Sequence, residues 1–288
     1  MTIKTQQIGR RRFLKQTLLA SAAVLAARDI HASERARIQI LLDEPIGTIS
    51  PDIYGHLTEH VGGVIYDGIW VGPDSPIPNI GGIRTALVEH MRCIKPPVIR
   101  WPGGCFAESY NWRDGVGPRD KRPRHTNFSI DAYFLKNAPD GPAKFEPNQF
   151  GTNEFCRFCK LIGAQPYLAA NLRSGTPRDF DEWVEYCNAP APQTSLSALR
   201  AEMGDPEPFK VRFWGVGNES WGCGGDFTPE EYAREFRRFT AWVPRYAVPL
   251  AFIASGPSGG DLEWMRRFFQ RLTERDKGLL GRVYGCAS

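Results

Sequence analysis

The feature that most limits what this chain can fold into is the regular alternation of apolar segments with amphipathic segments after residue 50. Hydrophobic residues at helical spacing predict helices, whereas β-branched and aromatic runs bounded by Gly or Pro predict strands. The predicted strands are 52–60, 98–106, 165–172, 209–221, 250–255 and 282–288, and the predicted helices are 83–94, 151–162, 180–187, 229–243 and 262–272. Such alternation predicts a parallel sheet with helical crossovers.

Two parallel α/β folds fit this pattern, a doubly wound sheet and a (β/α)8 barrel. No Gly-x-Gly-x-x-Gly motif follows a predicted strand, so the dinucleotide-binding form of the doubly wound sheet lacks its signature. Polar candidates stand at the ends of the first, second and fourth strands, where barrel enzymes place their sites. A closed barrel needs eight strands, and this chain supplies five and the start of a sixth. We therefore expect an incomplete (β/α)8 TIM barrel over residues 51–288, with about five and a half β/α units.

The fourth strand carries the best candidate for a catalytic residue. Its apolar stretch runs into Gly-Asn218-Glu219, and a helix start follows at Thr228-Pro-Glu-Glu, which has the pattern of a capping box. The indoles of Trp214 and Trp221 could raise the pKa of Glu219, as a general acid requires, and the Asn218 amide could bind a substrate hydroxyl. The alternative is an exposed loop glutamate that caps the next helix.

The N-terminus has the features of an export signal. Residues 10–15 read Arg-Arg-Arg-Phe-Leu-Lys, and an apolar run follows at 17–27. The pattern resembles the twin-arginine signal, although Gly9 stands where Ser or Thr is usual. The apolar run is too short for a stable membrane anchor. We expect residues 1–32 to be a leader that is cleaved after Ala27 or Ala32, and the protein to be periplasmic or extracellular. The alternative is a disordered or amphipathic tail.

Composition adds few constraints. The net charge of +4 is small and partly lies in the leader, so it does not point to a nucleic-acid partner. The seven cysteines have no disulfide-framework spacing, and the one Cys-x-x-Cys, Cys156 and Cys159, fits the buried face of a helix. A zinc site would need a second ligand pair at a metal-like spacing. We expect no metal, no cofactor and no obligatory disulfide.

Five motifs occur in a fixed order along the chain, and the last is the strand-four turn. They are Tyr-Gly-x-x-x-Glu-His at 54–60, Ile-Arg-Trp-Pro-Gly-Gly at 99–104, Tyr-Asn-Trp-x-Asp-Gly-Val-Gly-Pro at 110–118, Asn-Glu-Phe at 153–155 and Gly-Asn-Glu at 217–219. Together they resemble the α-L-arabinofuranosidases of glycoside hydrolase family 51, over about residues 37–288. In that family the strand expected at 37–42, within residues 33–50, belongs to a β-sandwich domain.

The resemblance implies roles for five residues. Glu219 looks like the general acid/base of a retaining glycosidase, and Asn218 looks like the ligand of the sugar 2-hydroxyl. Glu59 is similar to a glutamate that binds arabinofuranose hydroxyls, although pairing with His60 or Arg100 is a structural alternative. Arg100 resembles an arginine that orients active-site carboxylates. Cys105 stands at a substrate-binding position where some members carry Asn.

Other residues near these motifs have less specific expectations. Trp101 and Trp112 could equally be core or cleft residues. Glu108 and Asp114 match no catalytic position, so we expect solvated or helix-capping roles for them.

The family's nucleophile, a glutamate on strand seven, has no counterpart among the 288 residues. We therefore expect the chain as written to be poorly stable or self-associating, and to have no turnover. The resemblance implies arabinose-containing saccharides as substrates, and an oligomer is possible for a longer protein. Two alternatives stay open, another retaining barrel glycosidase such as a xylosidase or endoglucanase, and a sugar-binding or vestigial protein without catalysis.

Overall fold

The computed structural model describes residues 39, 41, 43–126, 145–274 and 283–287. The chain divides into two units, Met1–Ile49 and Ser50–Ser288. The predicted leader lies outside the described residues, as does most of the predicted strand 37–42. Gln39 and Leu41 are described, and neither is in a strand.

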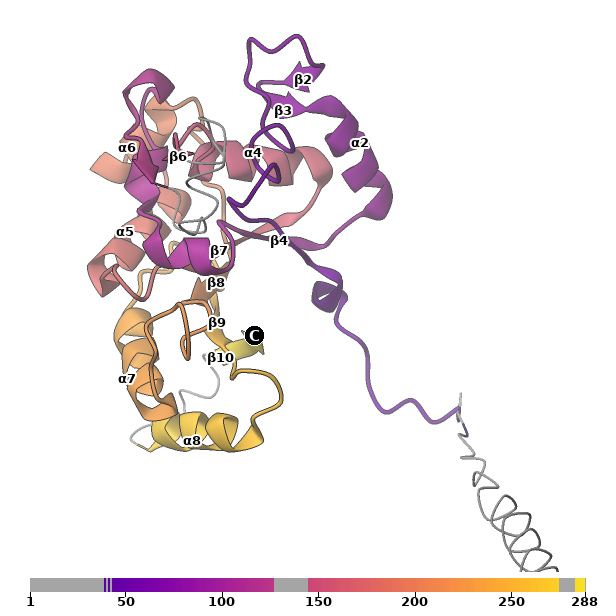
Figure 1. Cartoon of the computed structure of the whole chain (residues 1–288), viewed down its shortest axis with the longest axis vertical. Coiled ribbons are helices and arrows are strands. Elements are labelled where there is room, and N and C mark those ends of the chain that lie inside the picture. Colours follow the sequence, from indigo (N-terminus) through magenta and orange to yellow (C-terminus); the bar gives the residue numbers. More distant parts are fainter. Residues whose placement is uncertain (1–38, 40, 42, 127–144, 275–282, 288) are drawn as a thin grey trace, which may run out of the picture. The chain divides into compact units, whose positions relative to one another are not determined.

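Six parallel strands form the main sheet of the second unit (Figure 1). In spatial order they are β1 (His56–Leu57), β4 (Val98–Trp101), β7 (Gln165–Ala170), β8 (Phe213–Val216), β9 (Ala251–Ser255) and β10 (Val283–Ala287). Each strand pairs in parallel with the next. The spatial order repeats the chain order and never reverses, as it would in a doubly wound sheet. The predicted incomplete barrel is confirmed.

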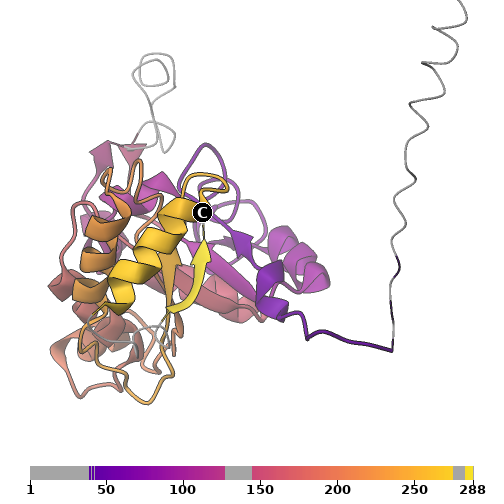
Figure 2. The ribbon, with the colours of Figure 1, turned by 90° about the horizontal axis from the view of Figure 1, so that it is seen from below.

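The helices that connect the strands begin and end close to the predicted positions, with one exception. They are α2 (Thr85–Ile94), α4 (Thr152–Ile162), α5 (Pro177–Asn188), α6 (Ser195–Glu202), α7 (Pro229–Thr240) and α8 (Leu262–Thr273). The predicted capping box starts α7, because Thr228 and Glu231 each accept a hydrogen bond from the other's backbone N–H. Figure 2 shows α7 and α8 packed side by side. None of the described helices is long and apolar enough to cross a bilayer.

Helix α6 was not predicted, because it lacks an apolar stripe. Its buried positions are Ser197 and Arg200. The first two predicted strands are shorter than expected, because 3-10 helices replace their ends. These helices are η1 (Pro51–Tyr54) and η2 (Cys105–Ser109), and two more follow, η3 (Trp112–Gly115) and η4 (Arg119–Lys121). Two small antiparallel pairs complete the described elements, β2 (Asn79–Ile80) with β3 (Ile83–Arg84), and β5 (His125–Thr126) with β6 (Phe145–Glu146).

The core between sheet and helices is unusually aromatic. Trp101 on β4 is fully buried and stacks on Phe155 of α4, with ring centroids 5.2 Å apart. Trp112 is also buried, so both tryptophans of undecided role have little exposed surface. Cys156 and Cys159 are free, buried thiols of α4, as predicted. This rigid core fixes the strand ends at which the candidate site lies.

Candidate active site

Glu219 lies just after β8, in a turn whose backbone is strained. Gly217 has φ of 85°, and a Cβ there would lie only 3.0 Å from Leu172 Cβ, so only glycine fits. Glu219 itself has φ of 40°, a conformation that non-glycine residues rarely adopt. Its side chain is half-buried. Such strain persists only where the surroundings impose it, and it is typical of functional sites.

Glu108, on η2, makes one of the contacts that hold this turn in place. Glu108 is fully buried, and its Oε1 accepts a hydrogen bond from the Asn218 N–H. Its Oε2 accepts from the N–H groups of Leu172 and Arg173, each at 2.8 Å. One carboxylate thus joins the ends of β7 and β8 to η2. The expectation that Glu108 is solvated or caps a helix was wrong, because the residue sits inside the strand ends.

Burial also changes the acidity of this group. It raises the pKa of Glu108 to about 7, against the opposing effect of three backbone N–H donors and of the Arg173 charge. Because its donors are all backbone groups of other segments, Glu108 acts as a structural support rather than as a free acid.

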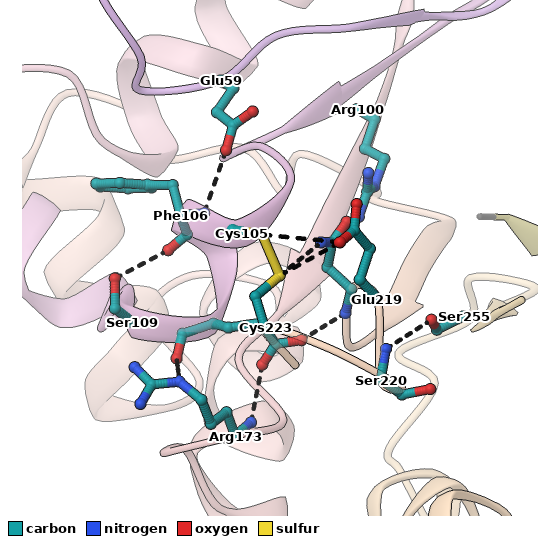
Figure 3. Close-up of a disulfide and its surroundings, with 12 residues drawn as sticks. Glu59, Arg100, Cys105, Phe106, Ser109, Arg173, Glu219, Ser220, Cys223 and Ser255 are labelled. Atoms are coloured by element: carbon teal, nitrogen blue, oxygen red, sulfur yellow. Dashed lines mark hydrogen bonds between the residues drawn. A yellow bond between two sulfur atoms is a disulfide. The ribbon is translucent and has the colours of Figure 1, made fainter. Parts of the chain in front are cut away.

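A disulfide joins the same two loops nearer to the surface. Cys105, at the start of η2, is bonded to Cys223, which lies four residues after Glu219 (Figure 3). The expectation of free thiols with no obligatory disulfide did not foresee this bond. The two cysteines are 118 residues apart in sequence, and only the pairing order of the sheet brings their loops together.

The Glu219 carboxylate faces this disulfide (Figure 3). Its Oε2 lies 3.9 Å from Cys105 Sγ and 3.7 Å from Cys223 Sγ. A disulfide sulfur carries no proton, so neither contact is a hydrogen bond. Cys105 also has no thiol to donate to a sugar, and in the disulfide it forms part of the wall beside the carboxylate.

Arg100 and Asn218 form a second contact beside Glu219. The Arg100 Nη2 donates to Asn218 Oδ1 at 2.7 Å, and the guanidinium lies over the Tyr167 ring. This bond fixes which way the amide points and directs its NH2 group away from the guanidinium, toward Cys223 Sγ at 3.6 Å. Arg100 therefore orients the amide that adjoins the candidate acid.

Glu59 lies on the other side of the turn after β4. Its Oε1 accepts from the Phe106 N–H at 3.2 Å, at the start of η2. A Cβ on Gly103 would lie 2.3 Å from Glu59 Cγ, so the Gly-Gly turn is what lets this side chain lie against the backbone. The structural alternative of a pair between Glu59 and His60 is not seen, because His60 Nδ1 is 2.7 Å from Glu146 Oε2 and its Nε2 accepts from Trp101.

The indoles do not both flank Glu219 as expected. Trp214 is fully buried, and its ring packs edge-on against Phe180 and Trp183 in the core. Trp221 is partly exposed in the turn after Glu219. The alternation of side chains along β8 places Trp214 on the side of the sheet that faces the helices. The local sequence alone does not show which side of the strand faces the helices and which faces the site.

The structure thus brings together Arg100, Cys105, Asn218 and Glu219, with Glu59 on the adjoining turn. Two further residues of the cluster, Glu108 and Cys223, were missed. A signal existed for the disulfide, since each cysteine directly follows a glycine near the carboxyl end of a predicted strand. Nothing in the sequence distinguishes Glu108 from a solvated acid. Fold and site together define a class, an α/β barrel with polar groups gathered at the carboxyl ends of its strands, as in barrel enzymes.

Comparisons with known proteins agree with this class. A family model described as an alpha-L-arabinofuranosidase 1 domain matches residues 90–268. An intracellular exo-alpha-L-arabinofuranosidase of Bacteroides ovatus is 39% identical over 268 residues, which are 92% of this chain and 50% of that protein. Alpha-L-arabinofuranosidase C of Emericella nidulans is 40% identical over 78% of this chain and 42% of its own length.

Solved structures give the same result. The GH51 arabinofuranosidase of Xanthomonas axonopodis pv. citri matches with a TM-score of 0.74 and 40% identity, over 81% of this chain and 45% of that one. The Thermotoga maritima alpha-L-arabinofuranosidase, solved as an arabinose complex, matches with a TM-score of 0.66 and 38% identity, over 76% and 42%. The chain belongs to the α-L-arabinofuranosidases of glycoside hydrolase family 51. It spans about half the length of these curated relatives.

Proposed function

We propose that this chain carries the acid/base half of the active site of a retaining α-L-arabinofuranosidase. The substrates would be arabinoxylan- or arabinan-type saccharides that bear terminal arabinofuranosyl groups. The observation that carries the proposal is the position of Glu219, which is half-buried at the carboxyl end of β8 beside an amide fixed by Arg100. The relatives named as arabinofuranosidases support the sugar.

The geometry supports a separate role for each of three residues in the reaction. Glu219 would protonate the glycosidic oxygen as the bond to the anomeric carbon breaks, and would then take a proton from the attacking water. The Asn218 NH2 group, oriented by Arg100, would donate to the sugar 2-hydroxyl. Glu59, whose Oε1 is held by the Phe106 N–H, would accept from other hydroxyls of the arabinofuranose.

Retaining chemistry also needs a nucleophilic carboxylate about 5–5.5 Å from the acid/base group. We propose that this nucleophile is not among the 288 residues, and that these residues alone have no turnover. Two carboxylates suffice for the reaction, so the proposal includes no metal or cofactor.

We also propose that the protein is exported. The support is the twin-arginine pattern at residues 10–15 and the disulfide between Cys105 and Cys223, since such bonds persist in oxidising compartments. Fusing residues 1–32 to a reporter tests this directly. We expect export that is lost when Arg10, Arg11 and Arg12 are all changed to Lys, and a reporter that stays in the cytoplasm would contradict the proposal.

The function is tested by comparing the purified 288-residue chain with the product of the complete reading frame that encodes it. Each is assayed on an aryl α-L-arabinofuranoside, an aryl β-xyloside and a β-glucan. We expect the complete product alone to hydrolyse the arabinofuranoside, with retention. Turnover by a monomeric 288-residue chain would contradict the missing nucleophile. Preference for xyloside or glucan would contradict the substrate, and arabinose binding without hydrolysis by both proteins would indicate a sugar-binding protein.

A further inference from the structure

Three metal-ligand side chains meet beside the candidate acid, and they come from both loops of the site. The sulfurs of Cys105 and Cys223 and a carboxylate oxygen of Glu219 all lie within 4.8 Å of one another. In the oxidised protein the two sulfurs are bonded and cannot hold an ion. We propose that reduction of this disulfide creates a binding site for a thiophilic divalent cation such as Zn²⁺, with Cys105, Cys223 and Glu219 as its ligands.

The distances to the carboxylate already fit a tetrahedral zinc site. Ligands at about 2.3 Å for sulfur and about 2.1 Å for oxygen stand about 3.6 Å apart around tetrahedral zinc. The observed separations from Glu219 Oε2 are 3.9 Å and 3.7 Å. Only the two sulfurs must separate, to about 3.8 Å in the same geometry. Rotation of one cysteine about its Cα–Cβ bond moves its sulfur that far without moving the backbone.

The surroundings also suit a cation. All three ligands are half-buried, so that a reductant and an ion can reach them while part of the bulk water is excluded. Two thiolates and a carboxylate carry three negative charges, and zinc neutralises two of them. The Arg100 guanidinium binds the Asn218 amide, which in turn contacts Cys223 Sγ, and it adds a positive charge on this side of the site. The fourth position would take water, as in open zinc sites.

The chemistry balances with a small dithiol as the reductant. Two electrons pass from the dithiol, which becomes a disulfide, to the Cys105–Cys223 bond, and its two protons go to the released thiols. Zinc then displaces both protons, because thiolates are the binding form. A bound metal ion would also prevent the carboxylate of Glu219 from acting as an acid or a base. That consequence rests on the proposed function, whereas metal binding itself does not.

The test uses the full 288-residue chain and Co²⁺ as a spectroscopic probe of zinc sites. The protein is reduced with dithiothreitol, desalted without oxygen, and titrated with Co²⁺ and then Zn²⁺. We expect one Co²⁺ per chain, a thiolate-to-cobalt charge-transfer band with tetrahedral ligand-field bands, and displacement by Zn²⁺. The oxidised protein should show no such band. Near-ultraviolet circular dichroism of the buried tryptophans records that the reduced chain keeps its fold.

Variants separate this site from the other thiols. The double variant Cys105→Ser/Cys223→Ser should lose the band while it keeps the other five cysteines, Cys93, Cys156, Cys159, Cys187 and Cys286. Cys93→Ser, which removes an exposed free thiol, should keep the band. Glu219→Gln should weaken binding at least about tenfold, because a neutral amide replaces a charged ligand. The proposal is overturned if reduced and oxidised proteins bind alike, if the double variant still binds, if Glu219→Gln binds as tightly as the unchanged chain, or if reduction unfolds the protein.

Discussion

Two glutamates at the same edge of the sheet differ in every physical respect. Glu108 is fully buried, and three backbone N–H groups from two strand ends bind it. Glu219 is half-buried, stands on a strained backbone, and its Oε2 faces two sulfurs that cannot donate a proton. Both oxygens of the Glu108 carboxylate accept hydrogen bonds from the backbone, whereas Glu219 Oε2 faces the disulfide. The contrast separates a buried glutamate that supports the strand ends from a half-buried glutamate that is the candidate acid.

The largest expected effect comes from removing the support. Glu108→Ala leaves three buried backbone donors without partners, at about 1–3 kcal/mol each, so we expect the free energy of unfolding to fall by at least about 3 kcal/mol. Chemical denaturation of the 288-residue chain measures this. The matched control is Glu263→Ala on α8, an exposed acid paired with Arg266, which should change stability by no more than about 0.5 kcal/mol. Equal effects of the two substitutions would contradict a supporting role for Glu108.

The next effect comes from the covalent link between the loops. The double variant Cys105→Ser/Cys223→Ser removes a crosslink between residues 118 apart, and loss of a native disulfide lowers stability by about 2–5 kcal/mol. Cys93→Ser, which removes an exposed free thiol, should have almost no effect. Denaturation midpoints of both variants under non-reducing conditions check this prediction, and matching midpoints would show that the disulfide does not stabilise the fold.

A pH titration sharpens the comparison further. Burial raises the pKa of Glu108 from 4.5 to about 7, so between these values the folded chain holds a proton that the unfolded chain has lost. This contribution to stability is complete below pH 4.5 and is lost as the pH rises through 7. A shift of about 2.5 units corresponds to about 3 kcal/mol.

Glu108→Gln cannot titrate, so its stability should lack this fall between about pH 4.5 and 7, relative to the unchanged chain. Denaturation at several pH values measures the difference. Parallel pH profiles for the two proteins would show that the carboxyl ionises alike in the folded and unfolded states. That result would contradict a pKa of Glu108 raised by burial.

The smallest stability effect should come from Glu219, the candidate acid. Glu219→Gly relieves a positive φ of 40°, which we expect to raise the free energy of unfolding by up to about 1 kcal/mol while it removes the acid. Lys210→Gly, at an exposed residue with φ of 57°, is the control for the backbone effect alone. Marked destabilisation by Glu219→Gly would mean that this side chain, like that of Glu108, supports the fold.

The fold could be predicted from the sequence because hydrophobic periodicity and helix capping are local signals. The strand before Glu219 and the capping box at the start of α7 are both of this kind. The predictions that failed concern residues whose surroundings are formed by segments distant in the sequence. The pairing of Cys105 with Cys223, the burial of Glu108 and the core position of Trp214 all depend on which strands become neighbours, and no local window contains that information.

The central claim is that Glu219 is the acid/base of a retaining arabinofuranosidase, and leaving-group dependence tests it most directly. We expect the product of the complete reading frame to be active, and Glu219→Gln to lower its kcat/KM about 10²–10⁴-fold for substrates with poor leaving groups. The loss should be far smaller for a dinitrophenyl arabinofuranoside, and azide should restore turnover by replacing activated water. Asp114→Asn, in a neighbouring loop, serves as the matched control. An equal loss on both substrates, without azide rescue, would contradict the account.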